Sequence, residues 1–158
     1  MGMLSVARTG TAILVACAAA GCATTILRSG PIIDGYARAA CIPAVKEPTG
    51  WRAWDETITL RSGERVRIVG MPGSPGRIDV EYDGGKAKVI AASGGEKSVP
   101  IDVRFDAAND RLYVKFSRGI LEEAGYEYLH EFDLVHRRHL ASPRVAWTAL
   151  PPPCPDRS

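Results

Sequence analysis

The chain has 158 residues, of which 46% are hydrophobic, and its formal net charge is +2. This length suits one ordinary domain and a short additional segment. Basic and acidic residues alternate along the chain instead of clustering, so a nucleic-acid partner, which needs concentrated positive charge, is not expected.

The first 21 residues have the three-part layout of a secretory signal. Arg8 supplies the basic start, residues 11–20 form a short apolar run, and small residues precede Cys22. The run is shorter than the roughly 20 residues that span a bilayer. A cleavage point directly before a cysteine resembles the lipobox of bacterial lipoproteins. The resemblance implies that Cys22 is lipidated and becomes the N-terminus of the mature chain.

Cys17 also fits this motif, because Leu14 stands three places before it. Cleavage there would leave only residues 9–16 as the apolar core, which is short for a signal, so Cys22 is favoured and Cys17 is the alternative. An ordinary secretory signal cut elsewhere is a further alternative. Because Ala23 follows Cys22, the resemblance implies, for a Gram-negative source, a lipid anchor in the outer membrane that faces the periplasm.

The two remaining cysteines, Cys41 and Cys154, lie at opposite ends of the expected domain. Disulfides persist in an oxidising compartment, so a Cys41–Cys154 disulfide is predicted, with free thiols or a link to another chain as the alternatives. It would hold the proline-rich residues 151–155, which cannot form a helix or an inner strand.

Residues 22–50 are expected to be a lipidated N-terminus and tether, because loop signals stand at 29–31 and 47–50. Residues 32–41 between these signals suit one or two helical turns. Residues 51–158 are expected to form a β domain with a proline-rich C-terminal tail, because their apolar positions recur with a period of two.

One hairpin is predicted over residues 77–91, where apolar and charged residues alternate on both sides of Gly84-Gly85. A glycine pair suits a two-residue turn with positive φ at both positions. The register then gives one apolar and one charged face. The predicted pairs are Ile78–Ala91, Val80–Val89, Glu81–Lys88 and Tyr82–Ala87.

A second hairpin is predicted over residues 101–116 with a four-residue loop at 107–110. Its apolar face would pair Ile101 with Phe116, Val103 with Val114 and Phe105 with Leu112. Its outer face would pair Asp102 with Lys115 and place Arg104 on the Tyr113 ring, a cation–π contact.

Two further strand pairs complete the expected fold. Residues 57–60 pair with 65–69 if 62–64 form a three-residue loop, which sets Arg61 beside Arg65, and 126–134 pair with 145–150. About seven or eight short strands joined by hairpins predict an all-β domain, either an antiparallel β-sandwich or a small barrel.

No catalytic residue, metal or cofactor is expected. Residues 91–95 lack the first glycine of the Gly-x-Ser-x-Gly elbow, and no Cys/His spacing suggests zinc. The His136-Arg137-Arg138-His139 run would need a third ligand, such as His130 or Glu131, to bind a metal. An exposed basic hairpin tip that contacts lipid headgroups or an acidic partner is the favoured interpretation.

Trp51 and Trp54 stand three apart and either stack on a sugar or peptide or fill the core. With the basic run at 136–139 they are the candidate partner-binding residues. The chain is therefore expected to be a membrane-anchored, non-enzymatic binding or structural module of the cell envelope, with an envelope or periplasmic protein as partner.

The alternative is an inhibitor or immunity lipoprotein against a cell-wall-degrading enzyme. The chain is similar to small lysozyme-inhibitor lipoproteins in size, anchor, β content and disulfide use. Their Ser-Gly motif is followed by a tyrosine, whereas Ser93-Gly94 here is followed by Gly95-Glu96-Lys97-Ser98. The likeness is therefore one of fold alone.

Overall fold

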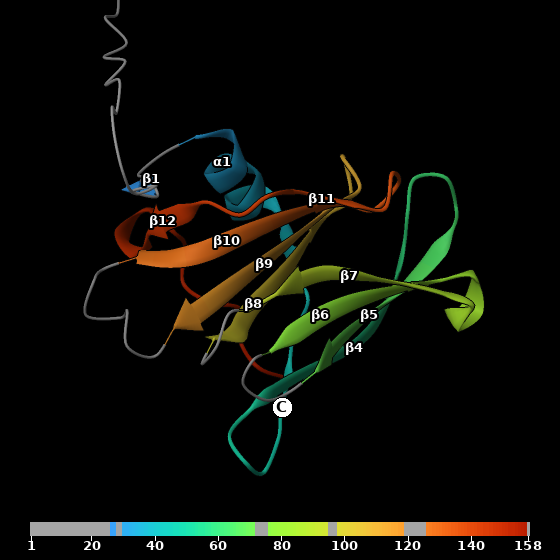
Figure 1. The fold of residues 1–158 in the computed structure, drawn as a ribbon, viewed down its shortest axis with the longest axis horizontal. Coiled ribbons are helices and arrows are strands. Elements are labelled where there is room, and N and C mark those ends of the chain that lie inside the picture. Colours follow the sequence, from blue (N-terminus) through green and yellow to red (C-terminus); the bar gives the residue numbers. More distant parts are fainter. Residues whose placement is uncertain (1–25, 28–29, 72–75, 95–97, 119–125, 158) are drawn as a thin grey trace, which may run out of the picture.

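The computed structural model describes residues 26–27, 30–71, 76–94, 98–118 and 126–157, so Cys17 and Cys22 lie outside the described residues. Two β-sheets face each other, and one helix, α1 (Pro31–Arg38), lies against the larger sheet (Figure 1). The predicted all-β class is confirmed. Within the described residues the two sheets stay separate, so the domain is a sandwich and not a closed barrel.

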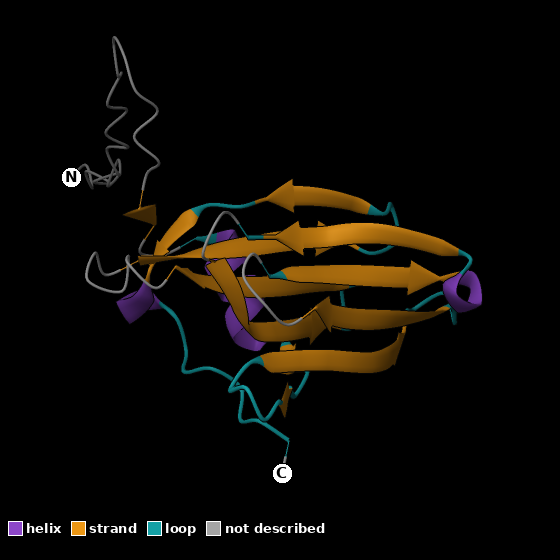
Figure 2. Ribbon diagram, turned by 60° about the horizontal axis from the view of Figure 1, so that its bottom comes forward, coloured by secondary structure: helices purple, strands orange, loops and turns teal. Residues whose placement is uncertain are grey.

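The larger sheet has the strand order β1-β12-β10-β9-β8-β2, and β11 also pairs with β10. Its pairings are antiparallel except that of β1 with β12, and Figure 2 shows the long strands of the domain lying side by side. The strands are β1 (Ile26–Leu27), β2 (Ala40–Cys41), β8 (Ser98–Asp106), β9 (Arg111–Arg118), β10 (Tyr126–Asp133), β11 (Arg138–Ala141) and β12 (Arg144–Ala146).

The smaller sheet is an antiparallel meander in the order β3-β4-β5-β6-β7. Consecutive strands are neighbours, as short hairpin connections require. Its strands are β3 (Val45–Lys46), β4 (Arg52–Thr59), β5 (Arg65–Met71), β6 (Arg77–Tyr82) and β7 (Ala87–Ser93).

The main core fills the space between the inner faces of the two sheets. Alternate residues of each strand point inward, so Val80 and Tyr82 of β6 share this core with Val114 and Phe116 of β9. These four side chains are at most 1% exposed. The alternation read from the sequence therefore selects the correct inner faces.

A second, smaller core lies between α1 and the outer face of the larger sheet. Ile33 and Tyr36 of the helix pack with Tyr113, Leu129 and Val145 from three strands. The helix satisfies the expectation of helical turns within 32–41. The expectation of a tether for 22–50, however, is wrong for Pro31 to Lys46, which pack into the domain as α1, β2 and β3.

The outer face of the larger sheet carries buried charge beneath α1 and the C-terminal tail. Asp102 is 1% exposed and accepts hydrogen bonds from the Tyr36 hydroxyl, from Arg104 Nε at 2.9 Å and from the Cys154 backbone N–H at 3.0 Å. Arg104 also donates to the Pro152 carbonyl at 2.7 Å. The sequence predicted that this face is exposed to solvent, but these hydrogen bonds and the covering segments bury its charged groups.

The predicted Cys41–Cys154 disulfide is confirmed, and its two cysteines are separated by 113 positions in the sequence. Beyond it, Arg157 donates its backbone N–H to the Ala44 carbonyl at 2.7 Å, and Asp156 pairs with Arg52 at 2.6 Å. The tail is thus held along its length by β8, β3 and β4.

The 77–91 hairpin has the predicted register next to its turn, where Val80 faces Val89 and Tyr82 faces Ala87. Gly84 and Gly85 both have the expected positive φ, at 66° and 91°. Further from the turn the prediction is wrong, since a bulge places Ile78 opposite Ala92 in place of Ala91. The bulge allows the consecutive alanines of β7 both to be buried.

The 101–116 hairpin also keeps its predicted register near the loop, with Val103 opposite Val114 and Asp102 opposite Lys115. The predicted Ile101–Phe116 pair is wrong, because Pro100 faces Phe116. A proline has no N–H to give to the ladder, and the strand is bulged beside it.

Two smaller expectations are also corrected. Arg104 lies over the Tyr36 ring, 4.4 Å from its centroid, and not over Tyr113. Thr59, not Arg61, faces Arg65, and Arg61 instead pairs with the buried Asp110 at 2.9 Å.

In the last predicted pair, the partner of β10 is the short β12, which ends at Ala146, and residues Trp147–Ala149 form a 3-10 turn instead of continuing the strand. The other end of β10 pairs with β11, a strand that the sequence did not predict.

Candidate functional site

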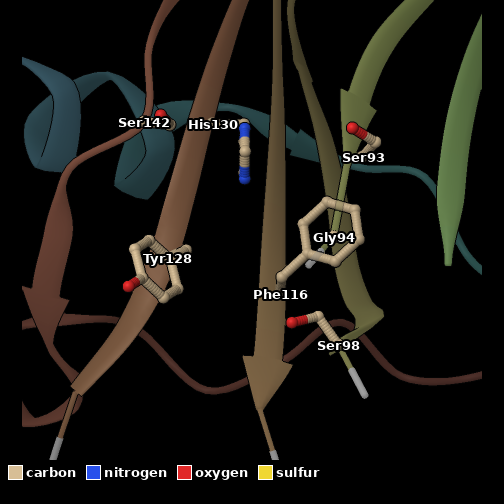
Figure 3. A pocket seen from close by; sticks show the side chains of 7 residues that line it. All are labelled: Ser93, Gly94, Ser98, Phe116, Tyr128, His130 and Ser142. Carbon is tan, nitrogen blue, oxygen red and sulfur yellow. The ribbon is translucent and has the colours of Figure 1, made fainter. Parts of the chain in front are cut away.

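A pocket of about 240 Å³ opens between the inner face of the larger sheet and the end of β7. Four neighbouring strands and the residue after β11 contribute to it, and Figure 3 shows the rings of Phe116, Tyr128 and His130 side by side, with serines around them. We call this the hydroxyl pocket. Its lining residues are Ser93, Gly94, Ser98, Phe116, Tyr128, His130 and Ser142.

Strand alternation aims the ring side chains into this pocket. Tyr128 and His130 share a face of β10 with the core residue Phe132, and Tyr128 lies directly opposite Phe116 of β9. On this face of β10, the polar side chains of Tyr128 and His130 therefore lie next to the apolar core residue Phe132. The result is a site that combines an aromatic wall with hydrogen-bonding groups.

The back of the pocket is formed by closely packed backbone at Gly94. A Cβ at this position would lie 2.5 Å from the Ser98 Cβ and 3.0 Å from the Phe116 ring. The Gly94 N–H donates to the Gly76 carbonyl at 3.0 Å, and the Gly76 N–H donates to the Ser98 carbonyl at 2.8 Å. Only glycine lets these segments come so close, and their contact fixes the positions of Ser93 and Ser98.

His130 forms a pair with His139 of β11, with 3.1 Å between His130 Nδ1 and His139 Nε2. The edge of the His130 ring also contacts Phe116, with 5.1 Å between ring centroids. Burial, and then the nearby His139, lower the pKa of His130 to about 4. His130 is therefore neutral at neutral pH and presents a nitrogen without a formal charge to the pocket.

The basic run at 136–139 does not form one site. The His136 Nδ1 atom lies 2.8 Å from Asp133, whose pKa falls to about 2, because hydrogen bonds from His136 and Arg111 outweigh the opposing effect of burial. Arg137, at a positive φ of 54°, covers the Tyr82 ring at 4.1 Å. Of these four residues, only His139 is connected to the hydroxyl pocket, through its contact with His130.

The other candidate residues also separate. Arg138 is exposed on β11, and Trp51 is 37% exposed beside Pro100 and Ile101. Trp54 is 2% exposed and donates its indole N–H to the Ile42 carbonyl at 3.0 Å. A partner-binding role for Trp54 is therefore wrong, because this residue belongs to the core.

No group of three or more His, Cys, Asp or Glu side chains able to hold a metal ion occurs among the described residues. His136 and His139 do not converge, and His130 and His139 provide two nitrogens. Likewise, no helix in the part of the chain described by the structure has both the length and the apolar character needed to cross a membrane.

Two other hollows contain charged groups. One of about 280 Å³ lies between Trp147 and the proline-rich tail, above the ion pair of the buried Lys115 with Glu127. One of about 320 Å³ lies on the smaller sheet beside Arg65, Arg67 and Glu81.

Sequence reasoning considered His130 as a metal ligand or a general base and Ser93 as part of an inhibitor-like motif, but it did not bring them together with Ser142 and Tyr128 in one pocket. One signal was present, namely a histidine on the apolar face of β10, two residues before the buried Phe132. The serines lie on three separate segments, and no local motif connects them.

Comparisons of this chain with protein-family models, with curated proteins and with solved structures find no match. The function must therefore be inferred from the site itself.

Proposed function

We propose that this chain is a lipid-anchored lipoprotein of the cell envelope, and that its β-sandwich is a non-enzymatic module that binds an envelope or periplasmic component in the hydroxyl pocket. The anchor is Cys22, with Cys17 as the alternative, and in a Gram-negative source the domain faces the periplasm from the outer membrane. The lipobox-type residues before Cys22 support the anchor.

The observation that carries the binding role is the hydroxyl pocket. It combines an aromatic wall with polar groups that converge from separate strands, as small-ligand sites in proteins do. A disulfide and a buried ion network hold the surrounding sheet in place. A rigid framework of this kind lowers the entropy cost of binding.

Metabolic labelling with palmitate tests the anchor. The wild-type chain and Cys17→Ala should take up label, and Cys22→Ala should not, because the sulfur of Cys22 carries the lipid. Label lost from Cys17→Ala alone would move the anchor to the alternative cysteine. An unlabelled wild-type chain would refute the anchor.

Photocrosslinking in intact cells tests the pocket. A benzoylphenylalanine at Ser142, which is exposed at the rim, should capture a specific adduct. The same probe at Thr59, which is exposed on the smaller sheet, is the matched control and should not capture it.

Ser93→Trp provides the second arm of this experiment. Ser93 is an exposed rim residue, so a tryptophan there should block the opening without disturbing the core. The adduct at position 142 should then disappear. Equal adducts from positions 142 and 59, or an adduct that is insensitive to Ser93→Trp, would contradict binding in this pocket.

An inhibitor of a cell-wall-degrading enzyme is the second candidate function. It is favoured by the position of Ser93-Gly94, which forms one side of the opening with Ser93 exposed. Direct assay of lysozyme activity tests it, since an inhibitor should lower the rate at near-stoichiometric concentration and Ser93→Trp should restore the rate. Unchanged lysozyme activity would exclude lysozyme as the target.

A further inference from the structure

The polar side chains of the hydroxyl pocket share one chemical property. Ser93, Ser98, Ser142 and Tyr128 carry hydroxyls, and each hydroxyl both donates and accepts hydrogen bonds. None of the seven lining residues is lysine, arginine, aspartate or glutamate. The lining therefore offers hydrogen bonds in both directions without a formal charge.

His130 extends this property. A neutral imidazole carries one donor and one acceptor nitrogen, and His139 engages Nδ1. If Nδ1 accepts from His139, then Nε2 carries the proton and donates. If Nδ1 donates, then Nε2 accepts. His130 Nε2 can thus act either as a hydrogen-bond donor or as an acceptor toward a ligand. In this respect it resembles a hydroxyl group.

The aromatic wall adds a flat apolar surface. Phe116 is 1% exposed and belongs to the core, and Tyr128 of the neighbouring strand lies directly opposite it. Aromatic rings bind the apolar face of a ligand while polar groups hold its edge. The volume of about 240 Å³ is below the roughly 300–1,000 Å³ of sites for drug-sized ligands, so a single ring fits best.

We infer that the hydroxyl pocket binds one ring of an uncharged saccharide, with its C–H face against Tyr128 and its hydroxyls bonded to the exposed Ser93 and Ser142 and to His130. This inference rests on the proposed function, because it identifies the ligand class of the same pocket. A sugar hydroxyl both donates and accepts, so it matches every polar group in the lining. A carboxylate, phosphate or ammonium ion would lose water without gaining an opposite charge.

The test compares sugars of one ring size and different charge. The full chain, purified in a detergent without a sugar head group and labelled with ¹⁵N, is titrated with N-acetylglucosamine, glucosamine and glucuronic acid. N-acetylglucosamine should shift amide resonances around Ser93, Ser98 and Ser142. The charged sugars should bind at least about 10-fold more weakly, because their charge is not compensated in the pocket.

Two variants locate the binding. His130→Phe keeps a ring at this position and removes both nitrogens, so the affinity for N-acetylglucosamine should fall roughly 10-fold. Ser62→Ala, in the β4–β5 turn, is the matched control and should bind as the wild type does. The amide spectrum of each variant shows whether its fold is intact, and Ser93→Trp provides a second test if His130→Phe does not fold.

Three results would overturn the inference. They are equal binding of the charged sugars, shifts confined to residues outside the pocket, and no shift with N-acetylglucosamine up to about 50 mM, well above the millimolar Kd of a weak ligand. If the sugar fails while the specific adduct at position 142 persists, the pocket binds another class of ligand and the proposed function stands. If both fail, the proposed function fails as well.

Discussion

At the residue scale, His130 links the chemistry of the pocket to the stability of the fold. Its pKa in the folded chain is about 4, below the value of 6.5 expected for an unperturbed histidine. Between these two pH values the unfolded chain binds more protons than the folded chain, so the free energy of unfolding should fall as the pH falls. The shift corresponds to about 2–3 kcal/mol, lost as the pH drops from 6.5 to 4.

Urea denaturation at several pH values measures this effect. His130→Gln should remove most of the fall in stability between pH 6.5 and 4, whereas Thr59→Ala, at an exposed position of the smaller sheet, should retain it. A wild-type stability that stays flat across this range would show that His130 is not buried as described.

Gly70 provides a second prediction at this scale. A Cβ at this position would lie 2.6 Å from the Trp54 ring and 3.0 Å from the Trp54 backbone nitrogen. Gly70→Ala should therefore lower the free energy of unfolding by about 1–3 kcal/mol, as overpacking of a core does. Thr59→Ala, on an exposed position of β4, is the control and should change it by less than about 0.5 kcal/mol.

At the element scale, the sequence predicts hairpins well near their turns and poorly far from them. The glycine pair at 84–85 and the loop at 107–110 set the registers of β6–β7 and β8–β9 correctly for the nearest residues. Each prediction becomes wrong at a bulge, near Ala91 and beside Pro100. The alternation of apolar and polar residues does not predict where a bulge occurs, because the free-energy cost of the extra residue depends on contacts with the other sheet.

Contacts between distant elements explain the other differences. Residues 57–60 pair with β5 two positions away from the predicted register, and both alignments keep the same faces. The structure selects the one that frees Arg61 to reach Asp110, 49 positions further along the chain. In the same way, α1 covers Asp102 and Arg104, which strand alternation alone places in water. Patterns within one strand carry no information about such partners.

The buried network under α1 gives a prediction for this helix. Asp102→Ala would leave Arg104, 6% exposed, without its carboxylate, and would remove the acceptor for Tyr36 and for the Cys154 N–H. We expect a loss of about 3–5 kcal/mol, typical of breaking one side of a buried ion pair. Denaturant titration of the full chain measures it.

Asp55→Ala is the matched control for this variant. Asp55 pairs with Arg67 at 2.6 Å, but both side chains are about half exposed, so the loss of stability should be much smaller than that of Asp102→Ala. Similar losses for Asp102→Ala and Asp55→Ala would show that the network under α1 does not hold the helix.

At the scale of the whole molecule, the Cys41–Cys154 link encloses both sheets. Its stabilising effect comes mainly from restricting the unfolded chain, and for a loop of this length it is about 4–5 kcal/mol. The double variant Cys41→Ser/Cys154→Ser should lose this amount in denaturant titration. Reductant should lower the wild type to the same level and leave the double variant unchanged.

The folded tail should nevertheless stay in place in that variant. Arg104, Asp102 and Arg52 still bind it through Pro152, the residue 154 N–H and Asp156. Amide hydrogen exchange should therefore find the residue 154 and Arg157 N–H groups still protected under native conditions. A tail that exchanges freely without the disulfide would show that the covalent bond, and not the surrounding contacts, positions it.

The order of the two cysteines along the chain also constrains biogenesis. Every strand of both sheets precedes Cys154. A chain that is synthesised from its N-terminus therefore lacks the native disulfide partner of Cys41 until all of these strands have been made. The disulfide can therefore form only after the strands of both sheets have been synthesised. If Cys17 leaves with the leader and acylation occupies Cys22, no competing thiol is left, and oxidative misfolding to a scrambled monomer is avoided without an isomerase.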